Sequence, residues 1–440
     1  MSTESEADLP EDAVLPGTLS EALYAELVAF RRDLHRHPEL GNQEFRTTAA
    51  IKARLEQAGL EPRVLSLGTG LVCDIGVGGG AAPGPTPAPG PASTPAPASA
   101  STSGSAPASA SGPTPGSVLA LRADIDALPI PDTKTECAYR STVPDRAHAC
   151  GHDVHTTVVL GTGLVLAELH RQGLLPRPVR LIFQPAEEVL PGGAADAIES
   201  GVLDGVGRII AVHCDPRVDA GRIGLREGAI TSACDRLEVA LDGPGGHTAR
   251  PHLTTDLVTA AARVAVDVPA LVARRVDSRG GLAVTWGRIE SGHAPNVIPQ
   301  HAELSGTVRC LDLAAWRLAP DVVHAAIDEI ATLHRAKSEI TYVRGVPPVV
   351  NDPAVTELLR DAMVARRGAE SVEGTEQSLG GEDFSWYLEY VPGAMARLGV
   401  RPPGERQVRD LHQGDFDVDE YAIAVGVELF TAAALLDAAR

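Results

Sequence analysis

One cysteine and three histidines lie within eight residues of this 440-residue chain, in the stretch HACGHDVH at 148–155. Thiolate and imidazole groups favour zinc or another late first-row divalent metal. The spacing alone does not decide which of the four side chains, His148, Cys150, His152 and His155, would bind. Because no C-x-x-C pair occurs in the sequence, the pattern argues against the usual structural zinc site.

A pair of adjacent carboxylates, Glu187 and Glu188, follows the apolar run VRLIFQP. Neighbouring residues point in different directions, so one carboxylate can coordinate a metal while the other acts as general base toward a water molecule. The same pair on a helix surface would be only solvated charge. His213, after the run RIIAV, has an equivalent position, and His412 lies much later in the chain.

These residues fall at the ends of predicted strands or the starts of predicted helices. Strands and helices alternate in the manner of an α/β fold, and functional residues of such folds gather at the carboxyl ends of strands. Asp124 and Asp126 follow a strand, where they either orient a ligand or cap a turn. The expected helices lie at about 19–36, 47–58, 155–172 and 421–439, and the expected strands include 64–75 and 118–125.

From about residue 229 the pattern changes to strands separated by helices near 255–275 and 313–335, which predicts a self-contained α+β unit at 230–336. The remaining parts, 18–229 and 337–440, would form one discontinuous domain. Residues 81–116 contain only Ala, Pro, Ser, Thr and Gly. Such a segment has nothing to bury, so we expect it to be disordered and to enlarge a hairpin or strand connection.

The composition limits the class of partner. The formal charge of −20 would repel nucleic acid and anionic membranes, so a small molecule is the more natural partner. The acidic N-terminal stretch does not read as a secretory signal, and no apolar run is long enough to span a membrane. We therefore expect a cytoplasmic protein. Its six cysteines are too scattered for a disulfide framework.

Seven motifs in order resemble the aminoacylase/carboxypeptidase family of dinuclear metallohydrolases. They are RRDLHRHPELGNQEFRT, LRADIDALPI, HACGHDVHTT, FQPAEE, GPGGHTARPH, NVIPQHAELSGTVR and GGEDFSWYL. The nearest branch contains hippurate hydrolase, N-acyl-amino-acid amidohydrolases and auxin-conjugate hydrolases. The resemblance implies a three-layer, zinc-peptidase-like catalytic domain with a mixed sheet. It also implies an inserted ferredoxin-like α+β unit that serves as a lid and forms a homodimer.

The resemblance also assigns roles to residues. Two divalent metal ions, Zn²⁺, Mn²⁺ or similar, would be held by Cys150, His152, Glu188, His213 and His412, with the Cys150 thiolate between them. Glu187 would be the general base. His247 of the lid would reach the active site of the partner subunit and stabilise the oxyanion.

Three further residues are assigned to the substrate. Asn296 and Arg309 would hold its carboxylate, and His252 would either contact it or pack within the lid. His148 and His155 are expected to support the ligands or to lie at the start of a helix rather than to bind metal. Glu382 and Asp383 would either close the pocket or begin a helix.

The predicted activity is hydrolysis of an N-acyl amino acid to a carboxylic acid and a free amino acid. A metallo-dipeptidase or aminopeptidase is an alternative within the same class. A catalytically silent metal-binding relative is an alternative from another class, although such a protein would be free to lose Glu187.

Overall fold

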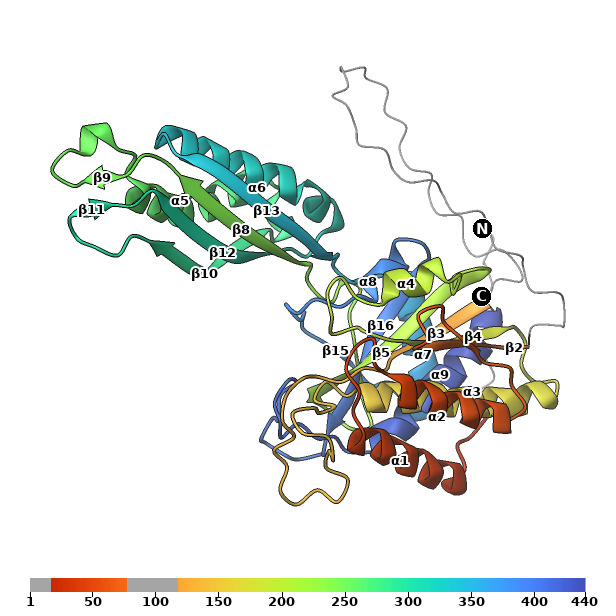
Figure 1. Ribbon diagram of the computed structural model, residues 1–440. Coiled ribbons are helices and arrows are strands. Elements are labelled where there is room, and N and C mark those ends of the chain that lie inside the picture. Colours follow the sequence, from red (N-terminus) through yellow and green to blue (C-terminus); the bar gives the residue numbers. More distant parts are fainter. Residues whose placement is uncertain (1–16, 77–117, 440) are drawn as a thin grey trace, which may run out of the picture.

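The computed structural model describes residues 17–76 and 118–439, so the segment predicted to be disordered, 81–116, lies outside the described residues. The chain forms a large body and an elongated second unit that projects from it (Figure 1). In the described part, no helix combines the length and apolar character needed to cross a bilayer.

The body is built on a mixed sheet of eight strands in the order β1-β2-β4-β3-β5-β16-β6-β15. The strands are β1 Arg63–Val64, β2 Leu71–Ile75, β3 Val118–Asp124, β4 Val179–Gln184, β5 Val206–Asp219, β6 Ile223–Leu225, β15 Val372–Gly374 and β16 Gly393–Arg401. The central strands β4, β3, β5 and β16 run parallel. β2 and β3, which flank the undescribed residues 77–117, both pair with β4 and not with each other, so they form no hairpin.

Helices cover both faces of this sheet. Side chains alternate along a strand, and Leu119 and Leu121 of β3 face one core while Ala120 faces another. The first core is covered by α1 Glu21–Arg36, α2 Phe45–Gln57, α3 His152–Arg171, α7 Pro353–Arg367 and α9 Tyr421–Leu436. The opposite core is covered by the shorter α4 Ala194–Glu199 and α8 Ser385–Leu388. The prediction of a three-layer α/β fold with a mixed sheet is therefore confirmed (Figure 1).

The second unit has a four-stranded antiparallel sheet in the order β10-β12-β8-β13 and its own apolar core. Its elements are β8 Cys234–Asp242, α5 Leu257–Arg275, β10 Ala283–Ser291, β12 His301–Arg309, α6 Leu313–Leu333 and β13 Lys337–Val346. This βαββαβ order is that of ferredoxin-like units. We call it the inserted unit.

The inserted unit extends past residue 336, where the sequence analysis placed its end. Lys337–Val346 alternates between exposed and partly buried side chains, and it pairs with β8 as the last strand of the small sheet. At the far end of the unit, the two-residue strands β9 Gly246–His247 and β11 Val297–Ile298 pair with each other. Near its base, β7 Gly228–Ala229 pairs with β14 Val350–Asn351.

Candidate metal centre

The central parallel strands and the segments that follow them bring the predicted ligands together, although His213 lies inside a strand and not at its end as the sequence predicted. Cys150 and His152 lie at the start of α3, Glu188 follows β4, and His213 lies within β5. His412 comes from a loop near the C-terminus, and its backbone N–H donates to the carbonyl oxygen of Ala149, 2.8 Å away. That hydrogen bond places His412 beside Cys150 even though more than 250 residues separate them in the chain.

The five donor side chains form two overlapping groups. The donor atoms of Cys150, His152 and His213 lie within 4.8 Å of one another, and so do those of Cys150, Glu188 and His412. Cys150 Sγ lies 3.5 Å from His213 Nε2, and His412 Nε2 lies 3.3 Å from Glu188 Oε1. Cys150 belongs to both groups, and Glu188 also belongs to a further group with His152 and Glu187.

Hydrogen bonds turn both buried histidines so that their Nε2 atoms face the site. Nδ1 of His213 donates to the carbonyl oxygen of Cys214 at 2.8 Å, and Nδ1 of His152 lies 3.2 Å from Asp126 Oδ1. Nε2 of His152 is buried and has no hydrogen-bond partner among the described residues. A thiolate, imidazoles and a carboxylate suit zinc and also manganese, so these residues fit a divalent metal.

Two aspartates hold the ligands in place. Asp126 contacts His152 through Oδ1, and its Oδ2 accepts the backbone N–H of Glu188 at 2.9 Å. Asp124 lies 2.6 Å from Nδ1 of His155, whose Nε2 accepts the backbone N–H of Cys214. Both nitrogens of His155 are therefore engaged within the protein, which leaves none for a metal.

The start of α3 depends on a glycine. Gly151 caps the helix with φ of 87°, in the left-handed region that other residues avoid. A β-carbon there would lie 2.6 Å from Cys214 Sγ, so even a small side chain would displace the loop that carries Cys150 and His152.

The two glutamates have opposite electrostatic environments. Burial and the charge of Glu382 raise the pKa of Glu187 well above its ordinary value. Burial acts in the same direction on Glu188, but the nearby His412 and His152 outweigh it and lower the pKa of Glu188. Oε2 of Glu187 lies 4.0 Å from His152 Nε2. One carboxylate is thus suited to remain ionised, and the other to exchange a proton.

A buried arginine that the sequence analysis missed balances the acidic groups behind Glu187. Arg122 of β3 lies 2.7 Å from Asp124, 2.7 Å from Asp383 and 3.1 Å from Glu382. Its Nε donates to Gln184 Oε1. Glu382 and Asp383 therefore belong to the wall of the site. In the sequence, its only sign is an arginine inside the otherwise apolar stretch SVLALRA.

The turn that carries Glu187 has an unusual backbone. Ala186 has φ of 58°, and its N–H donates to Glu44 Oε1 at 2.8 Å. Glu44 is fully buried, and this burial raises its pKa to about 7. The side chain of Glu44 therefore supports the backbone one residue before Glu187.

Four of the five predicted donors, all except His152, line a pocket of about 320 Å³. Cys150, Glu187, Glu188, His213 and His412 contribute to its wall, together with Glu382, Asp383 and Arg397. Arg397 was not predicted from the sequence; like Arg122, it is an arginine within a largely apolar strand.

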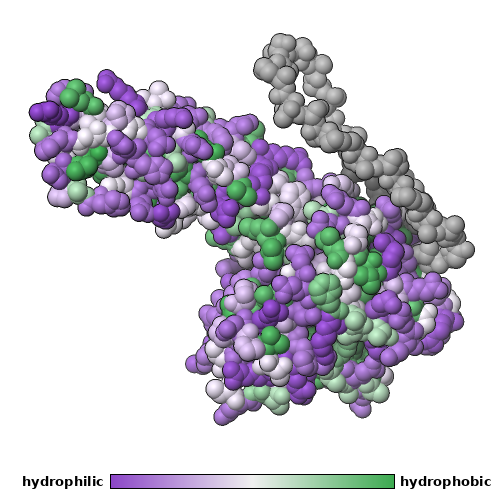
Figure 2. Space-filling view, viewed as in Figure 1, coloured by the Kyte–Doolittle hydropathy of each residue, from purple (hydrophilic) through white to green (hydrophobic). Residues whose placement is uncertain are grey.

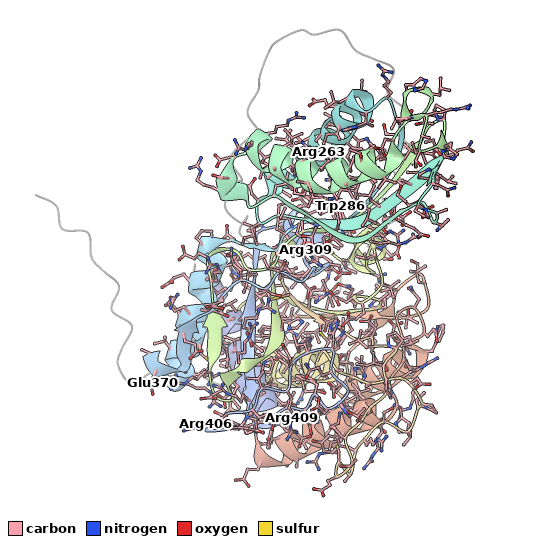
Figure 3. All side chains as sticks on the ribbon, turned by 90° about the vertical axis from the view of Figure 1, so that its left-hand side faces the viewer. Arg263, Trp286, Arg309, Glu370, Arg406 and Arg409 are labelled. Carbon is pink, nitrogen blue, oxygen red and sulfur yellow. The ribbon has the colours of Figure 1, made fainter. Side chains whose placement is uncertain are left out.

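The structure does not bring the predicted residues of the inserted unit to this pocket. His247 lies in β9, Asn296 precedes β11, and His252 lies in the short helix Pro251–Leu253; all three are exposed. These elements form the far tip of the unit (Figure 1). Arg309 lies at the base of the unit (Figure 3), where it donates to the carbonyl oxygen of Leu379, next to the pocket residues Ser378 and Gly380.

Comparison with known proteins identifies the family. A Rhodococcus jostii protein named for glutamate–cysteine ligase activity is 43% identical over 412 residues, which are 93% of this chain but 46% of that protein. The chain thus spans about half the length of that relative. The N-acetyl-L-cysteine deacetylase of Bacillus subtilis is 36% identical over 401 residues, 91% of this chain and 85% of that protein.

A solved structure agrees with the sequence relatives. Bacillus subtilis YXEP, described as a dinuclear metal-binding peptidase, is 32% identical and superposes with a TM-score of 0.75 over 96% of this chain and 99% of that one. Residues 120–436 match the profile of Peptidase family M20/M25/M40. The chain belongs to this family of metal-dependent hydrolases that act on amides.

Proposed function

We propose that the protein hydrolyses the amide bond of N-acyl amino acids and releases a carboxylic acid and a free amino acid. The observation that carries this proposal is the presence of Glu187 in one pocket with the predicted donors Cys150, Glu188, His213 and His412. The relative named N-acetyl-L-cysteine deacetylase gives a first substrate to test, N-acetylcysteine.

Two divalent cations, zinc or manganese, would be held by Cys150, His152, Glu188, His213 and His412. When bound, such cations lower the pKa of water toward neutrality and polarise the amide carbonyl. His213 and His152 offer Nε2, because their Nδ1 atoms are engaged with Cys214 and Asp126.

Glu187 acts as the general base. It removes a proton from the attacking water as the new C–O bond forms, and it returns that proton to the nitrogen as the C–N bond breaks. Its environment supports this role, because burial and the charge of Glu382 raise the pKa of Glu187 above its ordinary value and so make its carboxylate a stronger base. Glu382 and Asp383 surround it with further negative charge.

The inserted unit completes the site as a lid in a homodimer. His247 would stabilise the oxyanion in the partner subunit, Asn296 and Arg309 would hold the substrate carboxylate, and His252 would contact substrate. Exposure of His247, His252 and Asn296 at the tip, away from the pocket of their own subunit, supports action on a second copy.

A peptidase is the second candidate, favoured by the description of YXEP as a peptidase. A peptidase would use the same catalytic residues on a different substrate, so a test of cleavage of unmodified dipeptides distinguishes the two functions. A catalytically silent protein is the weaker alternative, because all five donors and Glu187 are present.

The decisive variant is Glu187→Gln, measured on N-acetylcysteine, other N-acetyl and N-benzoyl amino acids, and dipeptides. Loss of the base is expected to lower kcat by roughly 10²- to 10⁴-fold. The bound metal, measured by elemental analysis, should remain at the wild-type amount. A variant that retains near wild-type turnover would exclude Glu187 as the base. Wild-type cleavage of dipeptides alone would assign a peptidase.

A further inference from the structure

Arg397 is a buried cation in the wall of the pocket. It lies on β16, where it pairs in parallel register with His213 of β5, one of the candidate ligands. Only 5% of the residue is exposed. It lines the pocket together with Cys150 and Glu187, and among the described lining residues it is the one arginine or lysine.

This guanidinium lacks the partners that other buried arginines have. Arg122 and Arg31 are fully buried, and each lies within 3.3 Å of carboxylates from several elements. Within 17–76 and 118–439, by contrast, no carboxylate lies within 4.0 Å of a nitrogen of Arg397. Its Nη2 is buried without a hydrogen-bond partner.

The two carboxylates that act electrostatically on Arg397, Asp215 and Glu382, have other partners. Asp215 accepts the backbone N–H of Arg217 at 2.9 Å and contacts its side chain, and Glu382 faces Arg122. An unpaired buried charge is costly, so a site that retains one gains most when an anion enters. A guanidinium presents parallel N–H groups that match both oxygens of a carboxylate.

We propose that Arg397 binds a carboxylate of the substrate inside the pocket and thereby selects anionic substrates; this inference rests on the proposed amidohydrolase function. A substrate can carry this carboxylate at two positions. One is the α-carboxylate of the amino acid, which Arg397 would then bind together with Asn296 and Arg309, and the other is a second carboxylate on the acyl group, as in an N-succinyl amino acid.

Four substrates separate these positions: N-acetylmethionine, N-succinylmethionine and the α-amides of both. Arg397→Met removes the charge, and Arg397→Lys keeps it. Arg401→Met is the matched control, because Arg401 lies on the same strand but pairs with Asp219 and does not line this pocket. Metal content is measured for every variant.

The Arg397→Met variant is expected to lose roughly 10- to 100-fold in kcat/KM, mainly through KM, for substrates that carry the recognised carboxylate. The Arg397→Lys variant should recover part of this loss. A loss confined to the two free α-acids assigns the α-carboxylate, and a loss confined to the two succinyl substrates assigns the acyl carboxylate. An equal loss on all four, including N-acetylmethioninamide, overturns the inference, and so does loss of metal from Arg397→Met.

A binding experiment tests whether Arg397 binds a carboxylate even if the protein does not hydrolyse N-acyl amino acids. Methionine and succinate are titrated calorimetrically into metal-loaded wild type and Arg397→Met. If the wild type hydrolyses none of the four substrates, the proposed function fails, and Arg397 is judged by binding alone. A Kd at least about 10-fold weaker for one of the two acids in the variant supports carboxylate binding. An unchanged Kd for both overturns it.

Discussion

The pocket of the body and the tip of the inserted unit place their polar residues in opposite ways. In the body, Cys150 and His152 are 6% and 1% exposed, and aspartates fix the orientation of the ligands. At the tip, His247 in β9 and Asn296 just before β11 are exposed, and these two short strands pair with each other (Figure 1). The surface at this end of the unit is mainly hydrophilic, with scattered hydrophobic residues (Figure 2). Groups that bind metal and move protons need fixed geometry, whereas groups that approach from outside need to be accessible.

The largest effect is expected from a variant that removes a predicted ligand in the pocket of the body. Cys150→Ala removes the donor that both groups share, so we expect fewer than two metal ions per subunit. Activity should fall by more than the roughly 10- to 100-fold that is typical of changes outside the ligand shell. Elemental analysis and hydrolysis of N-acetylcysteine measure both quantities.

Cys234→Ala is the control for this experiment, because Cys234 also lines the pocket but belongs to no donor group. Two tightly held ions and normal turnover in Cys150→Ala would remove Cys150 from the ligand set.

The second largest effect is a loss of activity on replacing His247 at the tip. It tests whether this residue acts in the active site of another subunit. His247→Ala should lower kcat by roughly 10²- to 10³-fold, the usual loss for one oxyanion donor. Mixing it with Glu187→Gln under conditions that exchange subunits should restore activity, because a mixed dimer has one site with both groups intact. Random pairing gives about a quarter of wild-type activity.

Absence of recovery on mixing would show that His247 does not act across subunits. His301→Ala, in the same unit and exposed, controls for nonspecific effects of replacing a histidine there.

The smallest expected effect is on protein stability. It concerns Glu44, the buried side chain that accepts a hydrogen bond from the turn before Glu187. The pKa of Glu44, raised to about 7 by burial, means that the folded protein favours its neutral form. Its contribution to stability is therefore complete below about pH 4.5 and is lost as the pH rises through 7. In metal-free protein at pH 8, Glu44→Gln should raise the free energy of unfolding by on the order of 1–3 kcal/mol.

The same variant should differ little from wild type at pH 5, because the amide oxygen can still accept the N–H of Ala186. Urea titrations at both pH values measure the difference, with the exposed Glu56→Gln as control. An equal effect at both pH values would assign the change to packing instead of ionisation.

Local patterns account for what could be predicted from the sequence. The layers of the body follow from apolar periodicity, and the donors cluster because short motifs end or begin central elements. Arg122 and Arg397 were missed because a charge in an apolar strand is recognisable as functional only when its neighbours in other strands are known. The end of the inserted unit was misplaced because β13 pairs with β8, about a hundred residues earlier, and such pairing leaves no local signal.

The return of the chain to the body after the inserted unit has a consequence for biosynthesis. Cys150, His152, Glu188 and His213 are translated first, but β16 and His412 follow about 200 residues later. At roughly 5–20 residues per second, this interval lasts about 10–40 s. During that time a nascent chain carries an incomplete set of the proposed metal donors, so complete metal loading and hydrolysis are expected only after His412 has left the ribosome.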